Sequence, residues 1–273
     1  PGPGGRQINR MTGMNEWQLA CLGKENLEHP VQVWLKIDTG MHRLGIDPRC
    51  ASDVYKRLKS SPNVLDDIVL CTHFASADNL DSDQTQQQID QFESVCETLP
   101  GERSAANSPG VLGWPQAHYD WVRPGYMLYG NSPFTVPHTN TEALQPVMTL
   151  SSTIISIRDV NVGESVGYGA IWSATKPSRI ATVAIGYGDG YPRLARNGTP
   201  ALINGQRATL AGRVSMDMIS IDVTGLTEVN QGDEVILWGK DLLLVKIAEC
   251  ASTIGYELTT RMPARTPRVV PNS

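Results

Sequence analysis

The sequence contains no run of about 18 apolar residues, the length that a membrane-spanning helix requires. We therefore expect no membrane partner. Residues 1–6 (PGPGGR) lack the apolar centre of a signal peptide, and we expect residues 1–13 to be a tag-like or frayed segment.

Cysteine is also scarce: the five cysteines are odd in number and scattered, and no two have C-x-x-C spacing. This pattern argues against a disulfide framework and a structural zinc site. The five histidines are equally dispersed. We expect a reduced, cytoplasmic protein that needs no metal.

Positive charge is in deficit, with 23 basic residues against 28 acidic ones and a net charge of -5. A surface of this sign repels the phosphate backbone, so we expect no nucleic-acid partner.

Residues 14–140 alternate between strand and helix patterns. Apolar residues occupy every second position from Val31 to Ile37, which is the period of a strand. Asp47 and Pro48 then open a helical pattern, and a second helix is predicted over residues 81–99. Further strands are predicted at residues 68–73, 103–106 and 121–125, and a helix is expected to open at Ser108. Such alternation builds parallel sheets, of which a closed barrel is one form.

Residues 141–273 have a different, β-rich pattern. Residues 201–210 form two strand patterns joined by Asn204-Gly205, the strongest short signal for a hairpin. Strands are also predicted at residues 147–160, 218–222 and 234–238, with one late helix at residues 244–254.

These patterns predict two domains, an α/β domain over residues 14–140 and a β-rich domain over residues 141–273. The strand-helix units of the first domain amount to the C-terminal part of a (β/α)8 TIM-type barrel. An unclosed half-barrel leaves unpaired strand edges, so we expect a further N-terminal segment or another chain to complete it.

Polar clusters follow the predicted strands, where parallel α/β folds collect active-site groups. In the α/β domain they are residues 36–45 (KIDTGMHRLG), 72–78 (THFASAD), 105–108 (AANS) and 122–130 (VRPGYMLYG). In the β-rich domain they are residues 166–170 (VGYGA), 185–193 (IGYGDGYPR) and 212–217 (GRVSMD).

In this order and spacing, the clusters resemble the alanine racemases over nearly all of residues 14–270. The resemblance implies a pyridoxal-phosphate (PLP) enzyme that interconverts L- and D-alanine by a two-base mechanism and provides D-alanine for peptidoglycan. It also implies a homodimer with shared active sites, in which the β-rich domain of one subunit covers the barrel mouth of the other.

The resemblance assigns roles in proton transfer and cofactor binding. PLP acidifies the α-carbon through a Schiff base, and racemisation needs a base on each face. One family base is the PLP-bound lysine and the other a tyrosine that matches Tyr168. A free tyrosine has a pKa of about 10, so it needs neighbours that activate it, and the matching ones are His73, Arg43 and Arg123. Arg123 would face the pyridine nitrogen and keep it unprotonated, and His73 would pack against the ring.

The remaining roles concern phosphate, substrate and support. The implied phosphate ligands are Ser108, the backbone amides of Gly125 and Tyr126, and the Tyr256 hydroxyl. Asn107 is also implied to bind the cofactor. The substrate carboxylate would meet Arg43 and the Met216 amide, with Tyr187 also contacting substrate. Lys36 matches a carbamylated lysine that holds Arg43. The residues that match the family's substrate entrance or its support are Tyr187, Arg193, Asp78, Arg213 and Asp217.

Structural interpretations stand beside these functional ones. His73 alone would be a core histidine, and Tyr168 or Tyr187 alone would cover the edge of a core. Arg123 before a proline would only end a strand, and Lys36 would be a solvated strand lysine.

The family's PLP lysine lies in a KANAYG-like block, and none of the seven lysines of this sequence has that context. Residues 14–29 resemble the helix after the fourth barrel strand. We therefore expect the chain, if complete, to be inactive alone. Two alternatives stay open: an inactive binding or dimerisation fragment, and a related PLP amino-acid racemase such as a serine racemase.

Overall fold

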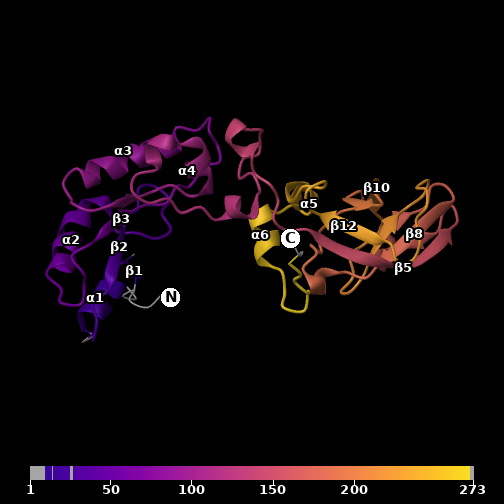
Figure 1. Cartoon of the computed structure of the whole chain (residues 1–273), viewed down its shortest axis with the longest axis horizontal. Coiled ribbons are helices and arrows are strands. Elements are labelled where there is room, and N and C mark those ends of the chain that lie inside the picture. The colour runs from indigo at the N-terminus through magenta and orange to yellow at the C-terminus, as the bar shows by residue number, and fades with distance from the viewer. Residues whose placement is uncertain (1–9, 14, 25–26, 271–273) are drawn as a thin grey trace. The chain divides into compact units, whose positions relative to one another are not determined.

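A computed structural model describes residues 10–13, 15–24 and 27–270, which form two compact units. Unit 1 comprises the chain up to Leu128 together with Ser132–Ala143, and unit 2 comprises Tyr129–Asn131 and the chain from Leu144. The predicted boundary between residues 140 and 141 lies within the Ser132–Ala143 segment of unit 1. Figure 1 shows both units, coloured in chain order.

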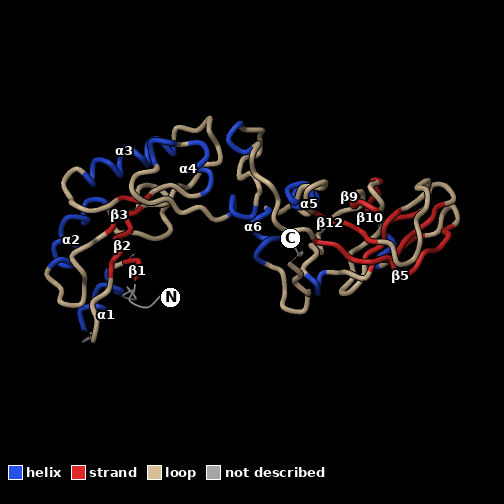
Figure 2. The backbone as a smooth tube through the Cα atoms, viewed as in Figure 1, coloured by secondary structure: helices blue, strands red, loops and turns tan. Residues whose placement is uncertain are grey.

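Unit 1 contains a parallel four-stranded sheet in the order β1-β2-β3-β4. Its strands are β1 (Arg10–Gly13), β2 (Gln32–Lys36), β3 (Val69–Cys71) and β4 (Arg103–Ser104). Its α-helices are α1 (Glu16–Lys24), α2 (Ala51–Lys59), α3 (Gln84–Cys96) and α4 (Ser108–Gly113); the first three connect successive strands and α4 follows β4 (Figure 2).

The period-two pattern of β2 decides which face of this sheet is covered. Val33 and Leu35 are fully buried and pack into one apolar cluster with residues of α1, α2 and α3. The alternate residues Trp34 and Lys36 lie on the opposite face and are only partly buried. Lys36 therefore ends β2 on the face that the helices leave free.

Two sequence predictions for unit 1 are wrong. Residues 10–13, predicted to be tag-like or frayed, form β1, which pairs with β2 so that Arg10 lies opposite Gln32. Residues 1–9 of the same predicted segment lie outside the described residues. Residues 121–125 form no strand but only an isolated bridge from Trp121 to Ser104. Pro124 has no N–H to donate, so a ladder cannot continue there.

Unit 2 is a closed six-stranded barrel in the order β10-β11-β8-β5-β12-β9. The strands are β5 (Leu150–Val160), β8 (Ser178–Val183), β9 (Pro200–Ile203), β10 (Gln206–Leu210), β11 (Ile219–Asp222) and β12 (Glu234–Trp238). The small pair β6 (Ser165–Val166) and β7 (Trp172–Ser173) and the helices α5 (Leu244–Cys250) and α6 (Gly255–Thr260) complete the unit.

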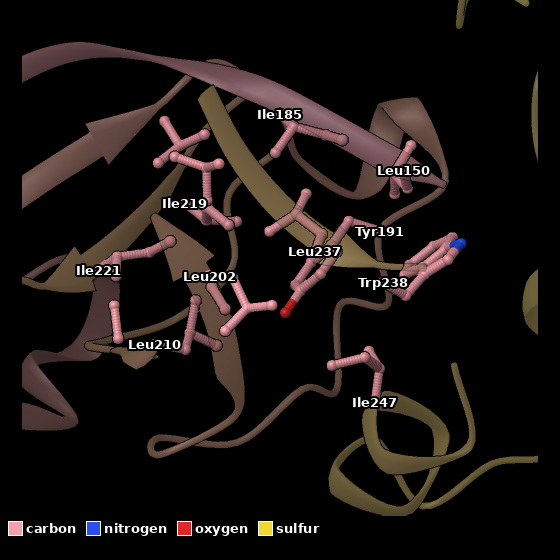
Figure 3. Packing of buried hydrophobic residues seen from close by; sticks show 14 of the residues in the cluster. Leu150, Ile185, Tyr191, Leu202, Leu210, Ile219, Ile221, Leu237, Trp238 and Ile247 are labelled. Carbon is pink, nitrogen blue, oxygen red and sulfur yellow. The ribbon is translucent and has the colours of Figure 1, made fainter. Parts of the chain in front are cut away.

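The predicted hairpin at Asn204-Gly205 is confirmed, because both residues have positive φ (50° and 73°) between the antiparallel β9 and β10. Inside the barrel, buried branched side chains such as Ile219 and Ile221 pack together, and Tyr191 stacks on Trp238 at 6.3 Å between ring centroids (Figure 3).

The parallel α/β sheet of unit 1 and the β-rich unit 2 match the predicted fold class. None of the helices in the described part of the chain has the length and apolar character needed to cross a membrane.

Candidate active site

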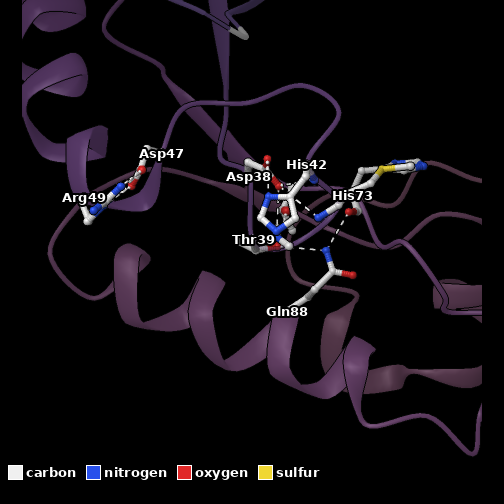
Figure 4. Close-up of polar contacts among 10 residues, drawn as sticks. Asp38, Thr39, His42, Asp47, Arg49, His73 and Gln88 are labelled. Atoms are coloured by element: carbon white, nitrogen blue, oxygen red, sulfur yellow. Dashed lines mark hydrogen bonds and ion pairs between the residues drawn. The ribbon is translucent and has the colours of Figure 1, made fainter.

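The loop after β2 is a fixed turn that starts at Lys36 and carries Arg43. The Asp38 carboxylate accepts hydrogen bonds from the backbone amides of residues 40–42 at 3.0 to 3.1 Å (Figure 4). Gly45 closes the loop with φ of +139°, and a Cβ there would lie 2.6 Å from the Asp38 backbone nitrogen. Only glycine fits this backbone conformation and close approach, so the sequence itself specifies the turn.

Arg123 is held at the carboxyl ends of β3 and β4. Its Nη1 donates to Ser104 Oγ at 2.6 Å, and its Nη2 donates to the carbonyl oxygens of Thr72 and Ala105 at 2.6 and 3.2 Å. The same Nη2 lies 3.4 Å from Nδ1 of His73. Four contacts from two strand ends therefore fix the guanidinium beside the imidazole.

His73 is neutral in this environment. Burial, followed by the positive charges of Arg123, Lys36 and Arg43, lowers the pKa of His73 to about 4. Because a guanidinium only donates hydrogen bonds, Nδ1 of His73 accepts and the ring proton lies on Nε2. Burial also lowers the pKa of Lys36, and the charges of Arg43 and Arg123 act in the same direction.

A cradle of backbone donors lies around Ser108, which is buried at the start of α4. Its Oγ accepts hydrogen bonds from the backbone amides of Gly125 and Met127 at 2.9 and 3.2 Å. Asn107 caps α4 through its side-chain oxygen, and Tyr126 is buried in the adjoining 3-10 helix. A Cβ placed on Gly125 would meet no atom within 4 Å, so the cradle opens onto free space.

A second cluster lies in a pocket of about 530 Å³ in unit 2. Its lining includes five residues that the sequence analysis selected: Tyr168, Tyr187, Arg193, Arg213 and Met216. The Tyr168 side chain is 70% exposed, and the Arg193 guanidinium lies 5.8 Å from the centre of the Tyr187 ring. The two glycine-rich turns and residues 213–216 thus converge on one concave surface.

Arg265, which the sequence analysis does not name, joins two loops of this pocket. Its Nε donates to Asp189 at 2.8 Å and its Nη2 donates to Asp217 at 2.5 Å. Asp189 also accepts from the Gly186 amide at 2.9 Å, and a Cβ on Gly186 would lie 2.3 Å from the carbonyl oxygen of Met216. The loops therefore touch backbone to backbone, and Arg265 clamps them.

Two predicted site residues stand apart from these contacts. Asp78 is exposed in the loop between β3 and α3. Tyr256 lies in α6 and is 39% exposed, and it is not among the residues that line the 530 Å³ pocket. Their assigned roles stay predictions. Among the described residues, no group of three or more histidine, cysteine, aspartate or glutamate side chains is placed to hold a metal ion.

Comparison with known proteins identifies the family. The family model described as "Alanine racemase, N-terminal domain" matches residues 9–133, and the family model described as "Alanine racemase, C-terminal domain" matches residues 147–270. The chain is 49% identical to the alanine racemase of Halorhodospira halophila over 92% of this chain and 69% of that protein. It is 52% identical to the catabolic alanine racemase of Pseudomonas putida over 92% of this chain and 70% of that protein.

Solved structures give the same result. The biosynthetic alanine racemase from Pseudomonas aeruginosa superposes with a TM-score of 0.92 at 46% identity, covering 95% of this chain and 72% of that one. The Bartonella henselae alanine racemase with covalently bound pyridoxal phosphate superposes with a TM-score of 0.81 at 30% identity, covering 93% and 70%. The chain belongs to the alanine racemase family of PLP-dependent isomerases.

Proposed function

We propose that this protein binds PLP in unit 1 and interconverts L- and D-alanine with groups from both clusters. The observation that carries the proposal is the partly buried Arg123 beside a neutral His73, next to the donor cradle at Ser108. These groups match the parts of PLP one by one. The Arg123 cation matches the pyridine nitrogen, the neutral His73 ring matches the aromatic ring, and the N–H and O–H donors at Ser108 match the phosphate.

The cofactor fits the residues present. Ser108, with the Tyr126 amide and the Gly125 amide that here donates to Ser108 Oγ, would hold the phosphate beside the free space at Gly125. Asn107 would fix α4, and Tyr256 would add a hydroxyl. His73 would lie against the ring and Arg123 at its nitrogen. When bound, PLP withdraws electrons and so acidifies the hydrogen on the α-carbon of the amino acid.

The protein's own groups orient alanine and move its proton. Arg43 and the Met216 amide would hold the carboxylate, and the Tyr168 hydroxyl would take or return the proton at one face of the α-carbon. The second base is a PLP-bound lysine in the family and is not assigned to any lysine of this sequence. Residues that would line or support the substrate entrance are Tyr187, Arg193, Asp78, Arg213 and Asp217.

We further propose a homodimer in which unit 2 of one subunit completes the site in unit 1 of the other. The support is chemical: the proposed cofactor residues other than Tyr256 belong to unit 1, whereas Tyr168, Met216 and Tyr256 belong to unit 2. A two-fold axis makes such a contact twice with one surface, and the covered site excludes water.

The proposed cellular role is D-alanine supply for peptidoglycan in the cytoplasm.

The test is a substrate and cofactor experiment on the full-length protein. PLP should bind, shown by its absorbance, and L-alanine should be converted to D-alanine and back. L-Serine is the competing substrate: faster turnover of serine than of alanine would identify a serine racemase instead. A protein that binds no PLP would contradict the proposal outright.

A further inference from the structure

Gln88 is a buried amide on a helix whose other glutamines are mostly exposed. It is 1% exposed in α3, whereas Gln84, Gln86 and Gln87 are exposed. A buried amide costs free energy unless its donors and acceptor are satisfied. The hydrogen-bond partners of Gln88 therefore show which parts of the chain this side chain connects.

The Gln88 amide joins two loops that follow different strands. Its Nε2 donates to the His73 carbonyl oxygen at 3.0 Å and to Thr39 Oγ1 at 3.3 Å. Its Oε1 accepts from the Ala75 amide at 2.9 Å, and Thr39 Oγ1 lies 2.7 Å from Thr72 Oγ1. Three bonds from one side chain thus tie the loop after β2 to the segment after β3.

Both of these loops carry groups of the proposed site. The His73 segment is held on one side by Gln88 and on the other by Arg123, which donates to the Thr72 carbonyl oxygen at 2.6 Å. Thr39 belongs to the fixed turn that leads to Arg43. A shift of the Gln88 amide would therefore move His73 relative to Arg43.

We propose that Gln88 is a positioning residue that sets the placement of the His73 ring relative to the Arg43 loop. The inference rests on the proposed function because His73 and Arg43 have catalytic roles only in that proposal. The hydrogen bonds by which Gln88 positions His73 lie within unit 1. Misplacement of a reacting group by about 1 Å can lower a rate about 100-fold.

Two variants of full-length protein test the proposal, each with a matched control. Gln88→Leu keeps the approximate size and removes all three hydrogen bonds, whereas Gln88→Glu keeps the acceptor for the Ala75 amide and loses the donors. Gln87→Leu and Gln87→Glu make the same changes at the exposed neighbour on α3. The readouts are kcat and KM in both directions, PLP affinity, the thermal midpoint, and the ¹H–¹⁵N imidazole signals of His73, assigned with His73→Gln.

Both Gln88 variants should lower kcat/KM about 10- to 100-fold and shift the His73 signals, while the Gln87 controls stay within about two-fold of the parent. Gln88→Glu should recover partly as the pH falls, because a protonated carboxyl regains a donor. Unchanged His73 signals in a folded Gln88→Leu protein would overturn the proposal, even if its thermal midpoint falls. If Gln88→Leu does not fold, Gln88→Glu and Thr39→Val decide by the same signals.

These outcomes separate the two proposals. A parent protein without racemase activity contradicts the proposed function, yet its His73 signals still report whether Gln88 positions the ring.

Discussion

Arg123 and His73 form a pair in which one permanent cation faces one neutral imidazole, with 3.4 Å between Nη2 and Nδ1. The pair exists because β3 and β4 end side by side, and the carbonyl oxygens of Thr72 and Ala105, which directly follow these strands, accept hydrogen bonds from the guanidinium. Burial and three nearby positive charges oppose protonation of the imidazole. This balance is testable without the cofactor.

The first prediction concerns the titration of His73. Its NMR midpoint should lie near pH 4, and Arg123→Gln should raise it without reaching the ordinary value of about 6.5, because burial is the larger cause. Since the unfolded chain binds this proton more readily, the free energy of unfolding should fall as the pH drops from about 6.5 to about 4. A His73 midpoint near 6.5 in the parent would contradict the prediction.

The second prediction concerns the proposed base in unit 2. Tyr168→Phe keeps the ring and removes the hydroxyl, so proton abstraction from one enantiomer should slow about 10²- to 10⁴-fold while PLP stays bound. Solvent-deuterium exchange measures each enantiomer separately, and cofactor absorbance reports binding. Tyr55→Phe in α2 is the control. Undiminished exchange with both enantiomers would remove Tyr168 from this role.

The third prediction concerns the clamp at Arg265. Arg265→Gln should lower kcat/KM about 10- to 100-fold, because the loops that carry Tyr187 and Met216 lose their shared anchor. The thermal midpoint should change little, since exposed ion pairs contribute about 0 to 1 kcal/mol. Arg261→Gln breaks a comparable pair with Glu257 in α6 and serves as control. Equal losses in both variants would argue against a clamp.

The fourth prediction concerns Lys36, which matches the family's carbamylated lysine. Its lowered pKa increases the fraction of neutral amine, which adds to CO₂ to form a carbamate and releases a proton to solvent. Protein in ¹³C-bicarbonate should therefore show one carbamate signal that disappears in Lys36→Arg. Lys59, whose pKa is raised by its hydrogen bond to Asp66, should not react. A signal that survives in Lys36→Arg but vanishes in Lys59→Arg would reverse the assignment.

The fifth prediction concerns shared sites. Full-length Tyr168→Phe and Arg123→Ala proteins should each be impaired, and mixing them should partly restore activity. In a mixed dimer with shared sites, one site receives both defects and the other neither. Mass measurements establish that subunits have exchanged; if they have and no activity returns, each site lies within a single subunit.

The sequence was informative where local patterns decide structure. The alternation around Val33 and Leu35 predicts β2, and Asn204-Gly205 predicts the hairpin of unit 2. β1 was missed because four residues ending in Gly13 are too few for a period to show, and they become a strand only by pairing with β2.

The site residues that escaped prediction act across long sequence distances. Gln88 looks like one glutamine among several on α3, and its role depends on Thr39 and His73, which lie on other loops. Arg265 meets Asp189 across 76 positions of the sequence. Neither relationship has a local signature, whereas the Asp38 turn does, because its partners follow within four residues.

The closed barrel of unit 2 also affects how the protein can diverge. Each of the six barrel strands is paired on both sides, so among the described residues the barrel itself leaves no unpaired strand edge to protect against aggregation. Tyr168, Tyr187 and Met216 all lie in connections between strands. Lineages of this protein should therefore change substrate preference by accumulating substitutions and insertions in these three connections, while the six strands stay nearly constant.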